Sequence, residues 1–312
     1  MPISRSSSES SIGKTLPTRN KCVAAMVRSG RPSLSISEPH LPRLHLARIT
    51  FLAMLALVVV SLFAPCAGAQ DTPGLYQATA IVTGTDMRSR PTGFARCLRD
   101  VLVKVSGEPR LIKDPRVAEL GRHADVFVVD FSYVDVMAGI PIHDDQGTYD
   151  RPHYLTVKFD PAKIDHALAD LGEKPWRGER PVVVPMLSMR RYGPPFLLSA
   201  ELAAAADERG SFAERAAEFG LSARIPSEAE LAGWGAEPGR IPPPPDAARA
   251  HEIVVAGTLA FNESVPGWEG SWRIHQNGRD YVWAIKGVNY DEAFRDIIRG
   301  VLRVASGHDG PI

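Results

Sequence analysis

Residues 97–107, C-L-R-D-V-L-V-K-V-S-G, decide how the first half of the chain folds. With Phe94, the apolar residues here recur every three or four positions, which is the spacing of one face of an α-helix. They are Phe94, Leu98, Val101, Leu102 and Val105. Gly107 stands where a helix needs a left-handed closing residue, and Pro109 prevents the helix from resuming. The stretch therefore predicts an amphipathic helix and its end.

The same stretch contains Cys97, the one cysteine that follows residue 66. A nucleophilic cysteine needs a neighbouring base and a strained turn, and the sequence shows neither. Cys97 lies at the flank of the apolar stripe, so we predict a buried thiol that acts as a small hydrophobic residue.

Strand and helix signals surround this helix and continue to the end of the chain. In the first half, β-rich runs at 75–83, 125–134 and 153–159 flank helices at 94–106, 115–121 and 160–171. In the second half, strands are predicted at 182–187, 252–261 and on both sides of a turn at 276–279, and helices at 197–218 (interrupted near 210), 227–231 and 289–306. The fold class is therefore α+β or α/β, with two small mixed-sheet units and amphipathic helices packed on the sheets.

The domain boundaries follow from changes in composition. Residues 1–48 are basic and rich in Ser and Pro, which indicates a disordered leader, and Met26 is an alternative start of translation. Residues 49–69 contain an apolar run too short for a bilayer span and an A-x-A motif, as in a secretory signal peptide cleaved near Ala69-Gln70. An uncleaved inner-membrane anchor is the alternative. An N-terminal α+β unit (70–172) and a C-terminal α/β unit (173–312) follow.

Charge excludes one class of partner. Residues 1–69 hold eight of the 36 basic and two of the 36 acidic residues, so the rest of the chain carries a net charge of −6. A nucleic-acid surface needs clustered Lys and Arg, and no such cluster follows the leader. We expect no nucleic-acid partner and no stable membrane insertion after cleavage.

Common catalytic motifs are absent from the mature region. It contains no G-x-S-x-G, H-E-x-x-H or G-x-G-x-x-G sequence, which argues against the hydrolases, metalloproteases and dinucleotide enzymes that carry them. Catalytic residues stay unknown, no cofactor is predicted, and an enzymatic activity is uncertain.

Two groups of side chains could form a site. A polar cluster that could ligate a divalent ion consists of His143, Asp144, Asp145, Asp150 and His153, although we favour the alternative that these residues form a solvated hairpin turn. An aromatic surface that could stack sugars or peptides consists of Trp268, Trp272, Tyr281 and Trp283. For these rings we favour the alternative that they pack beneath the closing helix.

Three motifs together resemble a known family. They are the helix end at 102–107 (L-V-K-V-S-G), the strand end at 157–160 (V-K-F-D), and Trp176 followed by Arg180-Pro181. The chain resembles the bacterial envelope family called domain of unknown function 2066. The resemblance implies an exported protein of Gram-negative bacteria with no assigned reaction.

The sequence thus predicts an exported periplasmic protein of the cell envelope that binds a protein or envelope component without catalysis. The alternative is an envelope hydrolase that uses the His143–His153 cluster, with or without the help of a metal ion. The oligomeric state is not predicted.

Overall fold

The computed structural model describes residues 74–140, 151–245, 249–264 and 266–311. Residues Gly68–Ile312 make up one compact unit by their mutual contacts. Two β-sheets, of three and six strands, combine with helices in a mixed α/β fold, which confirms the predicted fold class. None of the described helices is long and apolar enough to cross a membrane.

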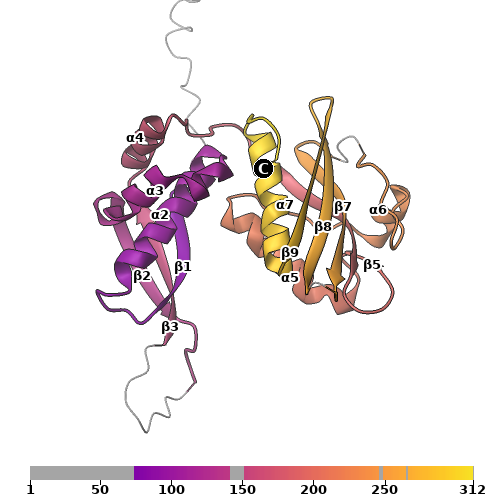
Figure 1. Cartoon of the computed structure of the whole chain (residues 1–312), viewed down its shortest axis with the longest axis horizontal. Helices are drawn as coiled ribbons and strands as arrows, with labels where there is room; N and C mark the ends of the chain where they lie inside the picture. Colours follow the sequence, from indigo (N-terminus) through magenta and orange to yellow (C-terminus); the bar gives the residue numbers. More distant parts are fainter. Residues whose placement is uncertain (1–73, 141–150, 246–248, 265, 312) are drawn as a thin grey trace, which may run out of the picture. The chain divides into compact units, whose positions relative to one another are not determined.

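The first sheet is antiparallel, with strand order β1-β3-β2. Its strands are β1 (Gln77–Thr83), β2 (Val128–Asp135) and β3 (Pro152–Phe159). The accompanying helices are α2 (Arg90–Ser106), α3 (Pro115–Gly121) and α4 (Pro161–Leu171), with short 3₁₀ turns η1 (Pro109–Lys113) and η2 (Ala124–Phe127). Helix α2 lies across one face of the sheet (Figure 1) and packs against β1 and β3.

The predicted helix in the opening stretch is confirmed. Helix α2 ends at Ser106, and Gly107 follows with a left-handed φ of 77°. Cys97 is fully buried, and burial raises the pKa of its thiol to about 12. A thiol with this pKa stays protonated at neutral pH, as expected of a core residue.

The second sheet has the order β5-β4-β7-β8-β9, and β6 also pairs with β4. Its strands are β4 (Val182–Arg190), β5 (Phe196–Leu197), β6 (Ser222–Ala223), β7 (Glu252–Asn262), β8 (Gly267–Gln276) and β9 (Arg279–Val288). Strands β4 and β7 are parallel, whereas β7, β8 and β9 form an antiparallel meander. The helices are α5 (Ala206–Glu218), α6 (Glu228–Gly233) and α7 (Tyr290–Ala305), with a 3₁₀ turn η3 (Ala203–Ala205).

The region predicted as an interrupted helix at 197–218 differs in the structure. Phe196 and Leu197 form strand β5 against β4, and the helix α5 begins at Ala206 and continues through Gly210. Alanine-rich sequence favours a helix locally, but the edge of β4 offers backbone partners to residues 196–197.

One hydrophobic core includes side chains from both sheets, among them Val157 of β3 and Trp272 of β8. A buried ion pair joins elements that are far apart in the sequence, because Arg303 Nε lies 3.0 Å from both carboxylate oxygens of Glu108. Removing one partner of such a pair leaves an uncompensated buried charge and costs about 3–5 kcal/mol.

Lys104 departs from its sequence pattern. Its position in α2 predicts that it faces away from the apolar stripe, yet the residue is buried. Its Nζ donates hydrogen bonds to the carbonyl oxygens of Gln77 (2.6 Å) and Gly74 (3.3 Å). Burial lowers the pKa of Lys104 to about 8.

Replacing Lys104 therefore has a pH-dependent effect on stability. Between about pH 8 and 10.5 the unfolded chain holds the Lys104 proton more tightly than the folded chain, so the contribution of Lys104 to stability rises with pH. Relative to a Lys104→Met variant, the wild type should gain up to about 3 kcal/mol across this window. Urea unfolding of both proteins at several pH values measures the gain.

The exposed Lys174 provides the control, because it is a lysine whose side chain lies at the protein surface. Lys174→Met should track the wild type at every pH. A constant difference between the wild type and Lys104→Met would contradict the burial of a charged amine at this position.

Candidate ligand-binding site

Two tryptophans form a cross-strand pair beneath α7. Trp272 of β8 and Trp283 of β9 are direct partners in the antiparallel register. Their exposed fractions are 1% and 8%. Helix α7 packs on both strands (Figure 1), so the pair lies between the sheet and the helix.

Glycine makes room for both rings. A Cβ atom at Gly300, in the middle of α7, would lie 2.5 Å from Cζ2 of Trp283, and one at Gly270 would overlap the ring of Trp272. Glycine inside a helix costs about 0.5–1 kcal/mol relative to alanine. The close approach of Trp283 to α7 nevertheless requires glycine at position 300.

The carboxyl group of Asp296, on the same helix, is held by one of these two tryptophans. Trp272 Nε1 donates a hydrogen bond to Asp296 Oδ2 at 3.0 Å. Burial raises the pKa of Asp296, while the Trp272 hydrogen bond and the positive charge of Arg299 oppose the rise. A desolvated acid with a raised pKa beside a cavity is a common feature of functional sites.

The indole nitrogen of Trp283 has no such partner. It lies near Asp296 and tends to lower the pKa of that group, but it makes no hydrogen bond of normal geometry. Among the described residues only Trp283 Nε1 and Arg215 Nε are buried without an acceptor, and Arg215 forms ion pairs through its other nitrogens. Buried donors are normally satisfied, so this N–H calls for an acceptor.

A cavity of about 370 Å³ opens beside these groups. Its lining comes from η1, β9 and α7 and comprises Pro109, Arg110, Ile112, Lys113, Trp283, Ile285, Glu292, Asp296, Arg299 and Gly300. Arg299 pairs with Glu292. Arg110 and Lys113 are exposed and form no ion pair with any described residue, so the cavity carries unneutralised positive charge.

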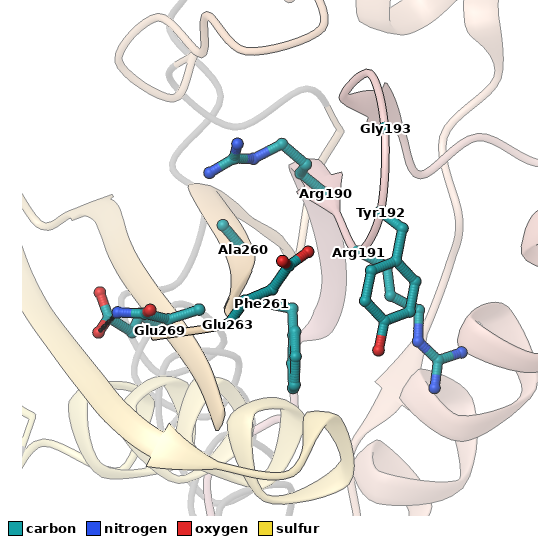
Figure 2. Close-up of a pocket in the computed structure, with 9 residues that line it drawn as sticks. Arg190, Arg191, Tyr192, Gly193, Ala260, Phe261, Glu263 and Glu269 are labelled. Carbon is teal, nitrogen blue, oxygen red and sulfur yellow. Dashed lines mark hydrogen bonds between the residues drawn. The ribbon is translucent and has the colours of Figure 1, made fainter. Parts of the chain in front are cut away.

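A second cavity of about 480 Å³ lies where the parallel strands β4 and β7 end (Figure 2). Arg190 and Arg191 border it and extend in different directions, with Tyr192 and Glu263 nearby. The carboxyl ends of parallel strands often bind ligands. No lining side chain of this cavity is both buried and without a hydrogen-bond partner, so the Trp283 cavity has the stronger chemical case.

The predicted aromatic surface is placed in the interior. Trp268, Trp272 and Trp283 are buried, and Tyr281 is half-buried. These rings therefore do not form an exposed stacking platform; Trp283 alone reaches the candidate cavity.

The predicted metal cluster lies mostly outside the described residues, because His143, Asp144, Asp145 and Asp150 fall in the segment 141–150. His153 is described in β3, where its Nδ1 lies 2.8 Å from the carbonyl oxygen of Arg151. In the described part of the chain, one group of three side chains brings potential metal ligands together: Glu108, Glu173 and His308.

The sequence did not single out Asp296, Arg110 or Lys113. Asp296 lies on a helix whose caps and apolar face were predicted, but a single acid in a helix is usually exposed. The signal that could have drawn attention to it is Gly300, an unexpected glycine four residues later in the same strongly amphipathic helix.

The packing of Trp283 is testable by comparing two helix glycines. Gly300→Ala should destabilise the protein by about 1–3 kcal/mol, since the added methyl group overpacks the core. Gly210→Ala in α5 should stabilise it by about 0.5–1 kcal/mol, because a Cβ there meets open space. Chemical denaturation measures both, and a Gly300→Ala protein as stable as Gly210→Ala would refute the close approach.

Comparison with known families corrects one sequence-based prediction. A family model described as Domain of unknown function (DUF8605) matches residues 69–177. The predicted membership of the 2066 family is therefore wrong, and the matching description assigns no activity. No match was found among curated proteins or among solved structures.

Proposed function

We propose that this is an exported binding protein whose ligand occupies the Trp283 cavity. The observation that carries the proposal is the indole N–H of Trp283, which is buried and makes no hydrogen bond of normal geometry in the described structure, on a residue that lines the cavity. A bound ligand with an acceptor atom would satisfy it. The volume of about 370 Å³ lies within the range of small-molecule pockets.

The charges around the cavity favour an anionic ligand. Arg110 and Lys113 supply two cations that no described carboxylate neutralises, while the charges of Glu292 and Arg299 cancel each other. Asp296 lines the same cavity, so Arg110, Lys113 and Arg299 set against Glu292 and Asp296 leave a formal net charge of +1. A carboxylate, sulfonate or phosphate can accept hydrogen bonds from an indole N–H, a guanidinium group and an ammonium group, the donors of Trp283, Arg110 and Lys113.

The remaining wall favours an apolar body on the same ligand. Pro109, Ile112, Trp283 and Ile285 contribute apolar surface, and burial of such surface contributes about 25 cal/mol per Å². The ligand class is therefore a small amphipathic anion. An envelope component of this chemistry agrees with the binding role expected from the sequence.

The cellular location rests on the leader sequence. Its apolar run and A-x-A motif support export to the periplasm with cleavage near Ala69-Gln70, and retention as an inner-membrane anchor is the competing outcome. Sequencing the N-terminus of the protein isolated from cells distinguishes them: a chain beginning at Gln70 supports cleavage, and an intact leader contradicts it.

A matched pair of fluorescent compounds tests the site. 8-Anilinonaphthalene-1-sulfonate should bind with 1:1 stoichiometry, while N-phenyl-1-naphthylamine, which lacks the sulfonate, should bind far more weakly. Arg110→Gln and Lys113→Gln should each weaken sulfonate binding about three- to fivefold, which corresponds to about 1 kcal/mol for a partly solvated ion pair. Fluorescence titration gives the affinities.

Two further variants test the Trp283 N–H and provide a control for the loss of a surface arginine. Trp283→Phe keeps an apolar ring but removes the N–H and should also weaken binding. Arg122→Gln, at the exposed C-terminal end of α3, should have no effect. Equal binding of both compounds, or equal effects of Arg110→Gln and Arg122→Gln, would reject the proposed site.

Binding should also depend on pH through Asp296. As the pH falls through the raised pKa of this group, its negative charge disappears, while the sulfonate stays charged. The affinity for the sulfonate should therefore increase toward acidic pH in the wild type and lose this dependence in Asp296→Asn. An unchanged pH profile in the variant would contradict the assignment of Asp296 to the cavity.

A further inference from the structure

Three chain segments meet at a cluster of potential metal ligands that shares no residue with the Trp283 cavity. Glu108 follows the end of α2, Glu173 follows the end of α4, and His308 follows α7. Each of the three residues lies two or three positions beyond a helix end, so the helices determine where the three side chains lie.

The ligand atoms have the spacing of a metal site. His308 Nε2 lies 3.2 Å from Glu173 Oε2 and 3.9 Å from Glu108 Oε2, and all three ligand atoms lie within 4.8 Å of one another. Two ligand atoms bound tetrahedrally to zinc are about 3.3 Å apart, given bonds of about 2.0–2.1 Å. Small rotations of the carboxylates would complete the geometry.

Ser306 orients the imidazole ring. Its Oγ lies 2.9 Å from His308 Nδ1, 3.0 Å from the carbonyl oxygen of Gly107 and 3.1 Å from that of Arg303. The hydroxyl has one proton, and the carbonyls can only accept. All three contacts fit a hydroxyl that donates to a carbonyl and accepts from Nδ1–H. The lone pair of Nε2 then faces the two carboxylates, and the supporting hydrogen bond at Nδ1 is the usual arrangement for a metal-bound histidine.

The charges around Glu108, Glu173 and His308 favour a bound cation. Arg303 binds both carboxylate oxygens of Glu108 and neutralises its charge. The carboxylate of Glu173 instead contacts His308. With a neutral imidazole the cluster carries one net negative charge. A carboxylate has about four lone-pair positions, so Glu108 can bind Arg303 and still offer one to a metal ion.

The cluster is accessible from a cavity of about 340 Å³ that Glu173, Ser306 and His308 border. This space admits the ion and leaves room for water in a fourth position. One imidazole and two carboxylates form a donor set that suits a divalent transition metal, in particular zinc.

We propose that Glu108, Glu173 and His308 form a divalent transition-metal site that ties together the ends of α2, α4 and α7. The mature chain, freed of metal by dialysis against a chelator, should bind Zn²⁺ with 1:1 stoichiometry in calorimetry. Binding to the folded state should raise the thermal unfolding temperature by several degrees. Co²⁺ should bind competitively and show the visible absorption of a four-coordinate oxygen and nitrogen site.

Glu173→Gln is the primary variant, since this side chain is partly exposed and its replacement leaves the Glu108–Arg303 pair intact. The amide should weaken Zn²⁺ binding at least tenfold and abolish the thermal shift. His166→Gln is the matched control, because His166 and Asp170 form an exposed histidine–carboxylate pair on α4, with 3.6 Å between Nε2 and Oδ2. It should bind Zn²⁺ as the wild type does.

Three results would overturn the metal site: no Zn²⁺ binding to the wild type, equal binding to Glu173→Gln, or loss of binding in His166→Gln alone. Circular dichroism of Glu173→Gln confirms that any loss of binding arises in a folded protein.

Discussion

The packing of Trp272 and Trp283 against α7 is the constraint on which the C-terminal part of the structure depends. The two rings are cross-strand partners, and they reach the helix because Gly270 and Gly300 leave space for them. This packing also brings two indole N–H groups to Asp296, of which one is bound and one is free. The same contact that stabilises the sheet on its helix therefore creates the polar wall of the candidate site.

The buried Glu108–Arg303 pair complements this packing near the C-terminal end of α7. It joins Glu108, two residues beyond the end of α2, to Arg303 of α7, across 195 positions of sequence. Burying two charges costs desolvation free energy, which only well-placed hydrogen bonds can offset. Arg303 meets this condition, because its Nε lies 3.0 Å from both carboxylate oxygens of Glu108. The pair also fixes Glu108 beside Glu173 and His308, so one interaction shapes both the core and the candidate metal site.

Local signals in the sequence predicted much of the secondary structure. Gly107 ends α2, Ser227 and Glu230 form the capping box of α6, and Asn289 caps α7, because caps depend on residues within one turn. The parallel pairing of β4 with β7 depends on partners far apart in the sequence, which propensity does not encode, and the two-residue strand β5 is too short to show a period. The candidate site was missed for the same reason: η1 and Asp296 meet only through the tertiary fold. The family prediction failed because its motifs mark strand and helix ends, which unrelated families share.

The most direct measurement of the central claim is the NMR signal of the Trp283 indole N–H. The chain contains five tryptophans, so each indole resonance can be assigned by substitution to phenylalanine. Adding 8-anilinonaphthalene-1-sulfonate should shift the Trp283 resonance and slow its exchange with solvent, while that of Trp272, already bound to Asp296, should change little. An unchanged Trp283 resonance at saturating sulfonate would contradict the account, as would a uniform shift of all five signals.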